Sequence, residues 1–476
     1  MDYYTIIGLE IHVQPKTKTK LFCSCSTQYS SEPNTNVCPI CLGMPGAMPY
    51  LNEEALKKAI LIGLSLNCNI SPKAVWDRKH YIYPDLFNGY QISQLTDPVN
   101  IKGYVDIDTP NGKKTIAINR AHLENDAAKS IHNTTQTFID GNESGMPLVE
   151  IVTEPDLRSA SDAVIFAKKV KEIIRWSGAS DCDMEKGQMR FDINISIGLG
   201  NGQHTPIAEI KNRNSFTELE DVIEFETLRQ IEDYEKNHVV YSHGKKTTRG
   251  WNSDTKQSFL MRTKEEANDY RYFPEPDIPT LYIPQQLIEE VKSSMKPPKN
   301  DYIDKLKKLG LSQKQIDSLL DDPEKTQLFE ETSKMLPKLS ELKIVNWILG
   351  DLSYMLNLLN INLSSSKLDI LKFGKLIALV ESKAISNTNA KIILESLLTH
   401  DIPNFEDYLK PHMNESNQDG LEESIEKVIN SNPQVIDQIK NGKESAKQFL
   451  VGMVMKEMKG KADPLNIKKI LDERIK

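Results

Sequence analysis

The stretch Ile6-Ile7-Gly8-Leu9-Glu10-Ile11-His12 reads as a β-strand that carries two polar side chains among aliphatic ones. Side chains on a strand alternate between its two faces, so Glu10 and His12 point to the same side. Four cysteines follow closely, at Cys23, Cys25, Cys38 and Cys41. A carboxylate and an imidazole on one strand face beside a cysteine cluster predict a structural metal next to a second, catalytic metal.

The cysteine spacing, C-x-C-x12-C-x2-C, is typical of a tetrahedral zinc knuckle, because two close pairs can converge on one ion. Ordinary buried cysteines or a disulfide pair are the alternative. Cys68 and Cys182 each stand alone and are predicted to be packing residues rather than nucleophiles.

Length and composition limit the class of protein. The chain has 476 residues, which exceeds the usual size of one core, and a net charge of -8 that argues against a nonspecific coat on nucleic acid. Residues 441–476 nevertheless hold nine Lys or Arg against five Asp or Glu. No apolar run reaches the ~18 residues of a membrane span, and no signal or transit segment is recognisable. We therefore expect a soluble cytoplasmic protein without a membrane partner.

Residues 1–292 are expected to form an α+β domain that includes the zinc knuckle. Alternating runs such as 114–118 and 191–197 predict half-buried antiparallel strands. Apolar residues at steps of three and four predict helices over 53–66, 161–177 and 218–237.

The rest of the chain is predicted to be helical. Two prolines in 293–300 mark a linker, and 341–360 carries one long apolar stripe within a helical domain at 300–405. A turn-rich stretch at 413–420 leads into a small helical tail at 421–476. In that tail the predicted core stripe is Ala446, Phe449, Leu450 and Met453, and the predicted solvated face is Lys456, Lys459 and Lys461.

Further carboxylates lie in apolar or strand-like segments of the first domain, where a charge needs a partner or a metal. They are Glu124, Glu150, Asp192 and Glu209. Together with Glu10 and His12 they suit Mg²⁺ and nucleotide phosphates. The alternative is that each faces solvent from the open side of a sheet. Convergence of all five carboxylates on one open sheet would favour the metal site.

Two segments combine cations with phenols, which suits binding of phosphate and carboxylate oxygens. One is 76–85, with Lys79 and Tyr81, and the other is 269–277. The phosphate loop G-x-x-x-x-G-K-[ST], the G-x-G-x-x-G turn and the G-x-S-x-G elbow are absent. An ATP-using enzyme of this sequence would therefore hold its nucleotide through a metal and side chains on a sheet.

With these motifs the chain resembles the B subunit of the tRNA-dependent amidotransferases (GatB), which convert Glu-tRNA(Gln) to Gln-tRNA(Gln) or Asp-tRNA(Asn) to Asn-tRNA(Asn). The resemblance covers essentially the whole chain, and residues 449–461 resemble the YqeY-like tail of that family. The matching motifs are Gly8-Leu9-Glu10-Ile11-His12, Val37-Cys38-Pro39-Ile40-Cys41-Leu42-Gly43-Met44-Pro45-Gly46, Asp77-Arg78-Lys79, Tyr83-Pro84-Asp85-Leu86, Gly89-Tyr90-Gln91-Ile92-Ser93, Glu150-Ile151-Val152-Thr153-Glu154-Pro155-Asp156 and the run from Asp269 to Asp277.

The resemblance implies a cradle domain with a glutamine-synthetase-like antiparallel sheet, a helical domain and a tail that touches tRNA. The cradle would use ATP and Mg²⁺ to phosphorylate the side-chain carboxylate of the misacylated amino acid. Ammonia from the family's amidase partner, the A subunit, would then displace the phosphate, and a small C subunit would brace the heterotrimer. Such a protein is a ligase of protein biosynthesis that takes its amide nitrogen from glutamine.

It also implies roles for particular residues. Glu10, His12, Lys79, Glu124 and Glu150 are the expected catalytic residues. Glu10, His12, Glu124 and Glu150 would bind Mg²⁺, and the four cysteines would bind zinc. Lys79, Tyr81, Asp192 and Glu209 would contact ATP, and Lys79 and Tyr81 are alternatively expected to line the ammonia path.

The chain departs from the family pattern at a few positions. Phe87-Asn88 stands where Pro-Lys is usual, Asn142-Glu143 where Asn-Arg is usual, and Asn125 and Ala128 replace a Glu and a Gly. These changes reflect either drift with compensation or partial loss of activity.

Two rival functions stay open. One is a zinc-stabilised tRNA-binding scaffold without catalysis, and the other is a free-standing ATP-grasp-like or guanidino kinase. Magnesium-dependent ATP binding that is lost in Glu10→Ala would favour an enzyme over a scaffold, and a requirement for partner subunits would separate it from a free-standing kinase. The sequence leaves open which of the two tRNAs is the substrate.

Overall fold

The structure is a computed structural model that describes residues 3–242, 246–264, 270–413, 418–440, 444–458 and 464–475. The chain divides into two compact units, Met1–Lys296 and Pro297–Lys476. The finer division of the second unit stays a prediction. Asp269, residues 414–417 of the turn-rich stretch 413–420, and both Lys459 and Lys461 lie outside the described residues.

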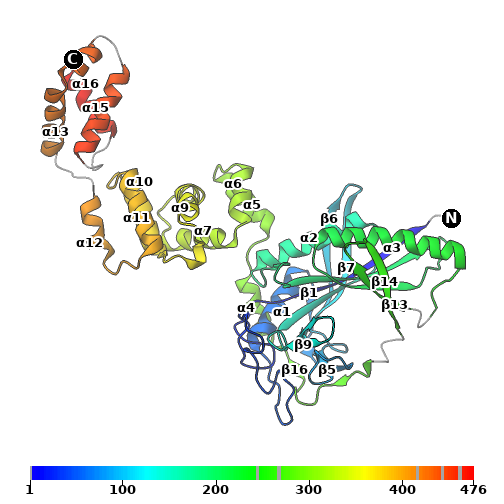
Figure 1. Cartoon of the computed structure of the whole chain (residues 1–476). Coiled ribbons are helices and arrows are strands. Elements are labelled where there is room, and N and C mark those ends of the chain that lie inside the picture. The colour runs from blue at the N-terminus through cyan, green and yellow to red at the C-terminus, as the bar shows by residue number, and fades with distance from the viewer. Residues whose placement is uncertain are drawn as a thin grey trace. The chain divides into compact units, whose positions relative to one another are not determined.

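A large sheet forms the centre of the first unit (Figure 1). In the described residues it contains nine strands in the order β14-β13-β12-β11-β1-β10-β7-β6-β2. The strands of the first unit are β1 Tyr4–Val13, β2 Asn69–Ile70, β3 Lys73–Ala74, β4 Asp77–His80, β5 Tyr90–Ser93, β6 Asn100–Thr109, β7 Gly112–Asn125, β8 Lys129–His132, β9 Thr137–Asp140, β10 Pro147–Thr153, β11 Met189–Gly198, β12 Ile207–Arg213, β13 Lys246–Asn252, β14 Gln257–Lys264, β15 Phe273–Pro274 and β16 Leu281–Tyr282.

Neighbouring strands of this sheet are antiparallel with one exception. β12 and β13 pair in parallel, so the sheet is antiparallel as predicted except at this pair. The reason is the connection, because parallel neighbours need a crossover and helix α3 (Phe216–Asn237) lies between these strands in the chain.

Three helices cover one face of the sheet: α1 (Glu53–Ser65), α2 (Ala160–Ser177) and α3. Figure 1 shows α2 and α3 lying across the strands. Each helix begins at a polar cap, as where the Asn52 side chain accepts hydrogen bonds from the first turn of α1. Under these helices Leu9, Ile11 and Ile193 are completely buried. Because side chains alternate along a strand, the polar residues of these strands lie on the opposite face of the sheet.

The prediction of half-buried strands is wrong for β11. Its outward residues Asp192 and Ser196 are almost as buried as Ile193 and Ile195 beneath the helices. The physical reason is that its outward face carries groups held in ion pairs, so it is covered by its own polar network rather than by solvent.

The second unit is helical in its described residues. Helix α4 (Gln285–Ser294) ends the first unit. The remaining helices are α5 Lys299–Lys308, α6 Gln313–Leu320, α7 Pro323–Met335, α8 Glu341–Trp347, α9 Ser353–Leu359, α10 Ile370–Glu381, α11 Asn387–Thr399, α12 Phe405–Leu409, α13 Gln418–Ser431, α14 Pro433–Lys440, α15 Glu444–Glu457 and α16 Pro464–Arg474. A π-helical turn at Ile348–Leu352 joins α8 and α9 and interrupts the helix predicted over 341–360.

Helices α13 to α16 pack around a core of their own, which includes Leu421, Ile425, Leu450 and Ile467. The predicted core stripe of α15 is wrong at Phe449, which is 56% exposed. Inward positions of α15 instead follow steps of four at Ala446, Leu450 and Val454, so Phe449 faces outward. Among all described residues, no helix has the length and apolar character that a bilayer crossing requires.

Candidate metal and phosphate site

Strand register brings the predicted acidic residues together on the face that the helices leave open. On β1, Glu10 pairs with Asp192 of β11, and His12 pairs with Glu150 of β10. Glu150 in turn pairs with His122 of β7, two residues before Glu124. Directly paired residues of antiparallel strands point to the same side of a sheet, so four central strands supply one cluster.

The cluster contains two adjacent sets of possible metal ligands. Glu10, His12 and Asp192 form one set, and His12, Glu124 and Glu150 form the other, each with ligand atoms within 4.8 Å of one another. His12 Nδ1 lies 3.7 Å from Glu124 Oε1 and is buried without a hydrogen-bond partner. A buried imidazole nitrogen without a partner among carboxylates fits a divalent cation.

Glu209 lies on the same face, at the side of the cluster. Its carboxylate is bound by Lys211 Nζ at 2.6 Å and by Lys246 Nζ at 3.3 Å. Lys211 also contacts Asp192 Oδ2 at 2.8 Å. Glu209 and its two lysines therefore form a group of mixed charge at the side of the cluster, which suits binding of phosphate oxygens. Glu209 belongs to neither of the two sets of possible metal ligands.

Lys79, on β4, and Tyr81, directly after it, lie beside the cluster. Lys79 Nζ lies 5.2 Å from the Tyr270 ring centroid and 5.9 Å from that of Tyr81. Burial works to lower the pKa of Lys79, but the charges of Glu124, Tyr272 and Glu150 together outweigh it and the pKa is raised. Tyr81 donates from its hydroxyl to Gln91 Oε1 at 3.3 Å. Lys79 is thus a permanent cation facing the acidic cluster.

Burial and mutual repulsion govern the protonation of the cluster. Burial, followed by the charge of Glu150, raises the pKa of Glu10. Burial would lower the pKa of His12, but its hydrogen bond to Asp192 and the charge of Glu150 raise it overall. For Glu124, burial is opposed by a hydrogen bond from His122, and the pKa is lowered. A carboxylate this strongly ionised in a buried place is suited to hold a cation.

Several residues of this face were not predicted from the sequence. His122 Nε2 lies 3.4 Å from Glu124 Oε2, and Asn194 Nδ2 donates to Glu10 Oε1 at 2.9 Å. Arg190 forms a bidentate pair with Asp126, with distances of 2.8 and 3.1 Å. Each of His122, Asn194 and Arg190, like Lys211, lies two residues from a predicted site residue on the same strand. The alternation of side chains along a strand therefore predicts that they share its face.

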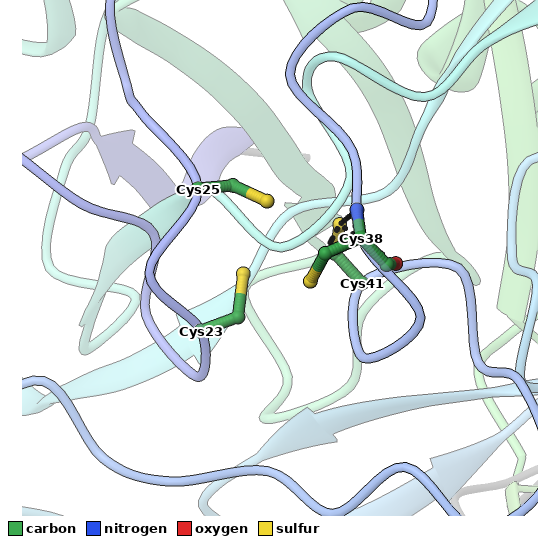
Figure 2. A group of neighbouring side chains, drawn as sticks. All are labelled: Cys23, Cys25, Cys38 and Cys41. Atoms are coloured by element: carbon green, nitrogen blue, oxygen red, sulfur yellow. Dashed lines mark hydrogen bonds between the residues drawn. The ribbon is translucent and has the colours of Figure 1, made fainter.

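The four cysteines converge as predicted from their spacing. Their Sγ atoms lie within 4.8 Å of one another, and none forms a disulfide. Figure 2 shows that they come from two separate loops and surround one space. Four thiols at this separation fit a structural zinc ion. Cys68 and Cys182 are both buried elsewhere, as expected of packing residues.

Lys20 links this knuckle to the segment that leads into β10. Its side chain is completely buried, and Nζ contacts Cys41 Sγ at 3.7 Å, Asn36 O at 2.7 Å and Gly141 O at 3.3 Å. Four thiolates around Zn²⁺ carry a net charge of about -2, which a buried cation partly balances.

We therefore expect Lys20→Met to weaken zinc binding by roughly 10–100-fold. Competition with a chromophoric chelator measures the affinity. Lys18→Met, an exposed position on the same loop, is the matched control and should bind zinc as wild type does. Equal affinity in the two variants would contradict a role of the Lys20 charge.

Two of the departures from the family pattern meet in space. Asn88 and Asn125 both line a pocket of about 130 Å³ beside the cysteine loops. The Asn88 side chain occupies the space that a Cβ at Gly43 would need, and Asn125 Oδ1 accepts from the backbone of Ile92 at 2.8 Å.

An open β-sheet face with two overlapping sets of possible metal ligands, flanking lysines and a separate cysteine site fits an enzyme that handles phosphate groups with a metal. Comparison with known families makes this specific. Residues 5–289 match the GatB/GatE catalytic domain, and residues 327–475 match the GatB domain. The chain belongs to the GatB family of amidotransferase B subunits.

Relatives in that family match over nearly their whole length. The aspartyl/glutamyl-tRNA(Asn/Gln) amidotransferase B subunit 2 of Clostridium acetobutylicum is 41% identical, with 99% of each chain covered. The corresponding B subunit of Caldicellulosiruptor saccharolyticus is 40% identical over 100% of this chain and 99% of its own. That of Persephonella marina is 39% identical over 100% of both.

Proposed function

We propose that this chain activates the side-chain carboxylate of Glu-tRNA(Gln), Asp-tRNA(Asn) or both, at the expense of ATP, for amidation by ammonia. The observation that carries this proposal is the convergence of Glu10, His12, Glu124, Glu150 and Asp192 on one open sheet face in a chain of the GatB family. A scaffold without catalysis would have no need of this buried charge.

The reaction has two displacements. A carboxylate oxygen of the bound amino acid attacks the γ-phosphorus of ATP, and ADP leaves. Ammonia then attacks the acyl phosphate carbon, and inorganic phosphate leaves with its bridging oxygen taken from the carboxylate. When bound, Mg²⁺ would neutralise charge on the phosphates during the first displacement.

The chain's own residues would hold the reactants in place. Glu10, His12, Glu124 and Glu150 are the proposed ligands, and Ser93 Oγ and His122 fix Glu124 by hydrogen bonding, Ser93 at 2.8 Å. Lys79 and Lys211 are the proposed partners of phosphate oxygens at opposite ends of the cluster. Tyr81, Asp192 and Glu209 would position these cations and the nucleotide.

We further propose that zinc at the four cysteines is structural, because the set is closed by protein ligands. An amidase, the A subunit of the family, and a small C subunit are the proposed partners in a heterotrimer, and the amidase would supply the ammonia. Since the proposed substrates are aminoacyl-tRNA and ATP, the proposed location is the cytoplasm. The proposed domain boundaries remain 1–292, 300–405 and 421–476.

The test is amide formation by this chain assembled with the candidate amidase and the candidate small partner. Glu-tRNA(Gln) and Asp-tRNA(Asn) are each supplied with ATP, Mg²⁺ and glutamine. Product that requires ATP supports the function and shows which tRNA is used. An assembled, tRNA-binding complex that forms no product with either tRNA would support the scaffold instead.

The tail is the proposed contact for tRNA. Because α13 to α16 share one core, removal has to begin at residue 414, before α13, rather than inside the bundle. We expect this deletion to weaken tRNA binding and to lower its salt dependence, because phosphate contacts release counterions.

Phe449→Ala, at an exposed ring that can stack on a base, should weaken binding by about 1–3 kcal/mol without altering the fold. Filter binding at several salt concentrations measures both. Unchanged affinity in both variants would contradict the tail assignment.

A further inference from the structure

Residues 270–277 lie against β4 and bring further side chains to the neighbourhood of Lys79. β15, within this segment, pairs with β4 in antiparallel fashion, with Phe273 opposite Arg78. Continuing this register by one residue places Tyr272 opposite Lys79. Opposed residues of an antiparallel pair share a face, so Tyr272 lies on the side of the small sheet that carries Lys79.

A buried ion pair holds this segment in place. The carboxylate of Glu275 is completely buried and accepts hydrogen bonds from Nε and Nη2 of Arg78, both at 2.7 Å. Arg78 also donates to Asp277 Oδ2 at 3.2 Å, and its guanidinium lies 4.3 Å from the ring centroid of Tyr90. Bidentate pairs fix orientation as well as distance. The segment that carries Tyr272 is therefore fixed on β4.

The chain makes a turn just before Tyr272. Arg271 has a left-handed φ of 44°, which is uncommon for a residue with a side chain. Nδ1 of His80 lies 3.2 Å from the carbonyl oxygen of Arg271. The rings of Tyr270 and Tyr272 meet edge to face, with centroids 6.1 Å apart. Unfavourable backbone conformations persist where the surroundings fix them, and they are frequent near active sites. This turn leaves both phenol rings beside Lys79.

The Tyr272 hydroxyl is a neutral donor that faces the acidic cluster. Burial raises the pKa of this phenol to about 12, although the charge of Lys79 works against the shift. The charges of Glu124 and Glu150 reinforce the shift, so the phenol lies within electrostatic reach of the cluster. No described residue forms a hydrogen bond with this hydroxyl, whereas that of Tyr81 donates to a neighbouring glutamine. Tyr272 is partly exposed, so its O–H is available to a bound substrate.

The second displacement needs a hydrogen-bond donor. When ammonia adds to the acyl phosphate, a C–N bond forms and the carbonyl π electrons move to oxygen. The carbonyl then re-forms as the bond to the bridging oxygen breaks, and phosphate leaves with a proton from nitrogen. Ionised carboxylates have no proton to donate to this oxyanion, whereas a fixed O–H stabilises it. The acyl carbon is joined to phosphorus through one oxygen, so it lies beside Lys79, the proposed partner of the phosphate.

We propose that Tyr272 is a catalytic residue whose hydroxyl donates a hydrogen bond to the oxyanion formed when ammonia attacks. This inference rests on the proposed function. It gives Tyr272 a role in the second displacement and none in phosphoryl transfer. A tyrosine that only packs against Lys79 would affect both displacements alike or neither.

Tyr272→Phe removes the hydroxyl and keeps the ring. Tyr282→Phe, at a side chain that is 74% exposed, is the matched control. The assembled complex receives aminoacyl-tRNA, ATP and Mg²⁺, with ammonium chloride as the nitrogen source, under single-turnover conditions. ADP and amide are measured in the same quenched samples, and the acyl phosphate is trapped with hydroxylamine as the hydroxamate.

We expect Tyr272→Phe to slow amide formation by about 10²-fold while ADP formation stays within about twofold of wild type. The acyl phosphate should accumulate, because its formation is retained and its consumption is slowed. Tyr282→Phe should match wild type in all three measurements.

Two results would overturn the role of Tyr272. One is equal slowing of ADP and amide formation in Tyr272→Phe, and the other is amide formation at the wild-type rate. Wild type that forms neither ADP nor amide would instead contradict the proposed function, and the inference would fall with it.

Discussion

Replacing Glu124 by Gln is expected to lower the rate of ATP-dependent amide formation by roughly 10²–10³-fold. The amide keeps the size of the side chain and its hydrogen bond from Ser93, but it removes the negative charge facing His12 and His122. The loss should appear in kcat, because that charge is needed where phosphate charge develops during the transfer. Single-turnover conversion of aminoacyl-tRNA by the assembled complex measures it.

Glu185→Gln is the matched control, since Glu185 is exposed on a loop before β11. It should react as wild type does. Affinity for tRNA should be unchanged in both variants. A Glu124→Gln complex that retains more than about a tenth of wild-type activity would remove Glu124 from the metal site.

The second large effect is on stability. Lys211→Met should lower the free energy of unfolding by about 2–3 kcal/mol, because it leaves the buried carboxylates of Asp192 and Glu209 without their shared cation. The expected loss is below that of a fully buried pair because the Lys211 side chain is 35% exposed. The same variant should bind Mg²⁺ more tightly, since the cluster becomes more negative. Urea unfolding and metal titration measure the two effects.

Lys169→Met removes an ion pair with Glu172 from the surface of α2. Its cost should stay within about 0.5 kcal/mol. Equal stability of the Lys211 and Lys169 variants would show that Lys211 does not balance the acidic face.

The predictable part of this site is the part that lies on single strands. Period-two alternation places Glu10 and His12 on one face from sequence alone. The same alternation places His122 and Lys211 on the faces of Glu124 and Glu209, because each lies two residues from that carboxylate. Which strands become neighbours is set by tertiary packing, so the pairing of Glu10 with Asp192 needed the structure.

Other features depend on contacts that no local pattern contains. β12 and β13 are parallel because the helix between them crosses over the sheet. Neither strand's own sequence indicates where the chain re-enters the sheet after that helix. Phe449 fits an apolar stripe in the sequence, but the inward positions of the helix are Ala446, Leu450 and Val454, so the ring lies outside the core. Asn88 and Asn125 are 37 positions apart in the sequence, and their shared pocket appears only once the chain is folded.

The central claim is that the side-chain carboxylate becomes phosphorylated on this chain before ammonia attacks. Its most direct test uses aminoacyl-tRNA whose side-chain carboxylate oxygens carry a heavy isotope, with mass analysis of the inorganic phosphate released during amidation. The mechanism requires that each amide formed transfer one labelled oxygen to phosphate. Amide formation that leaves the phosphate unlabelled would contradict the acyl phosphate and the role assigned to the acidic cluster.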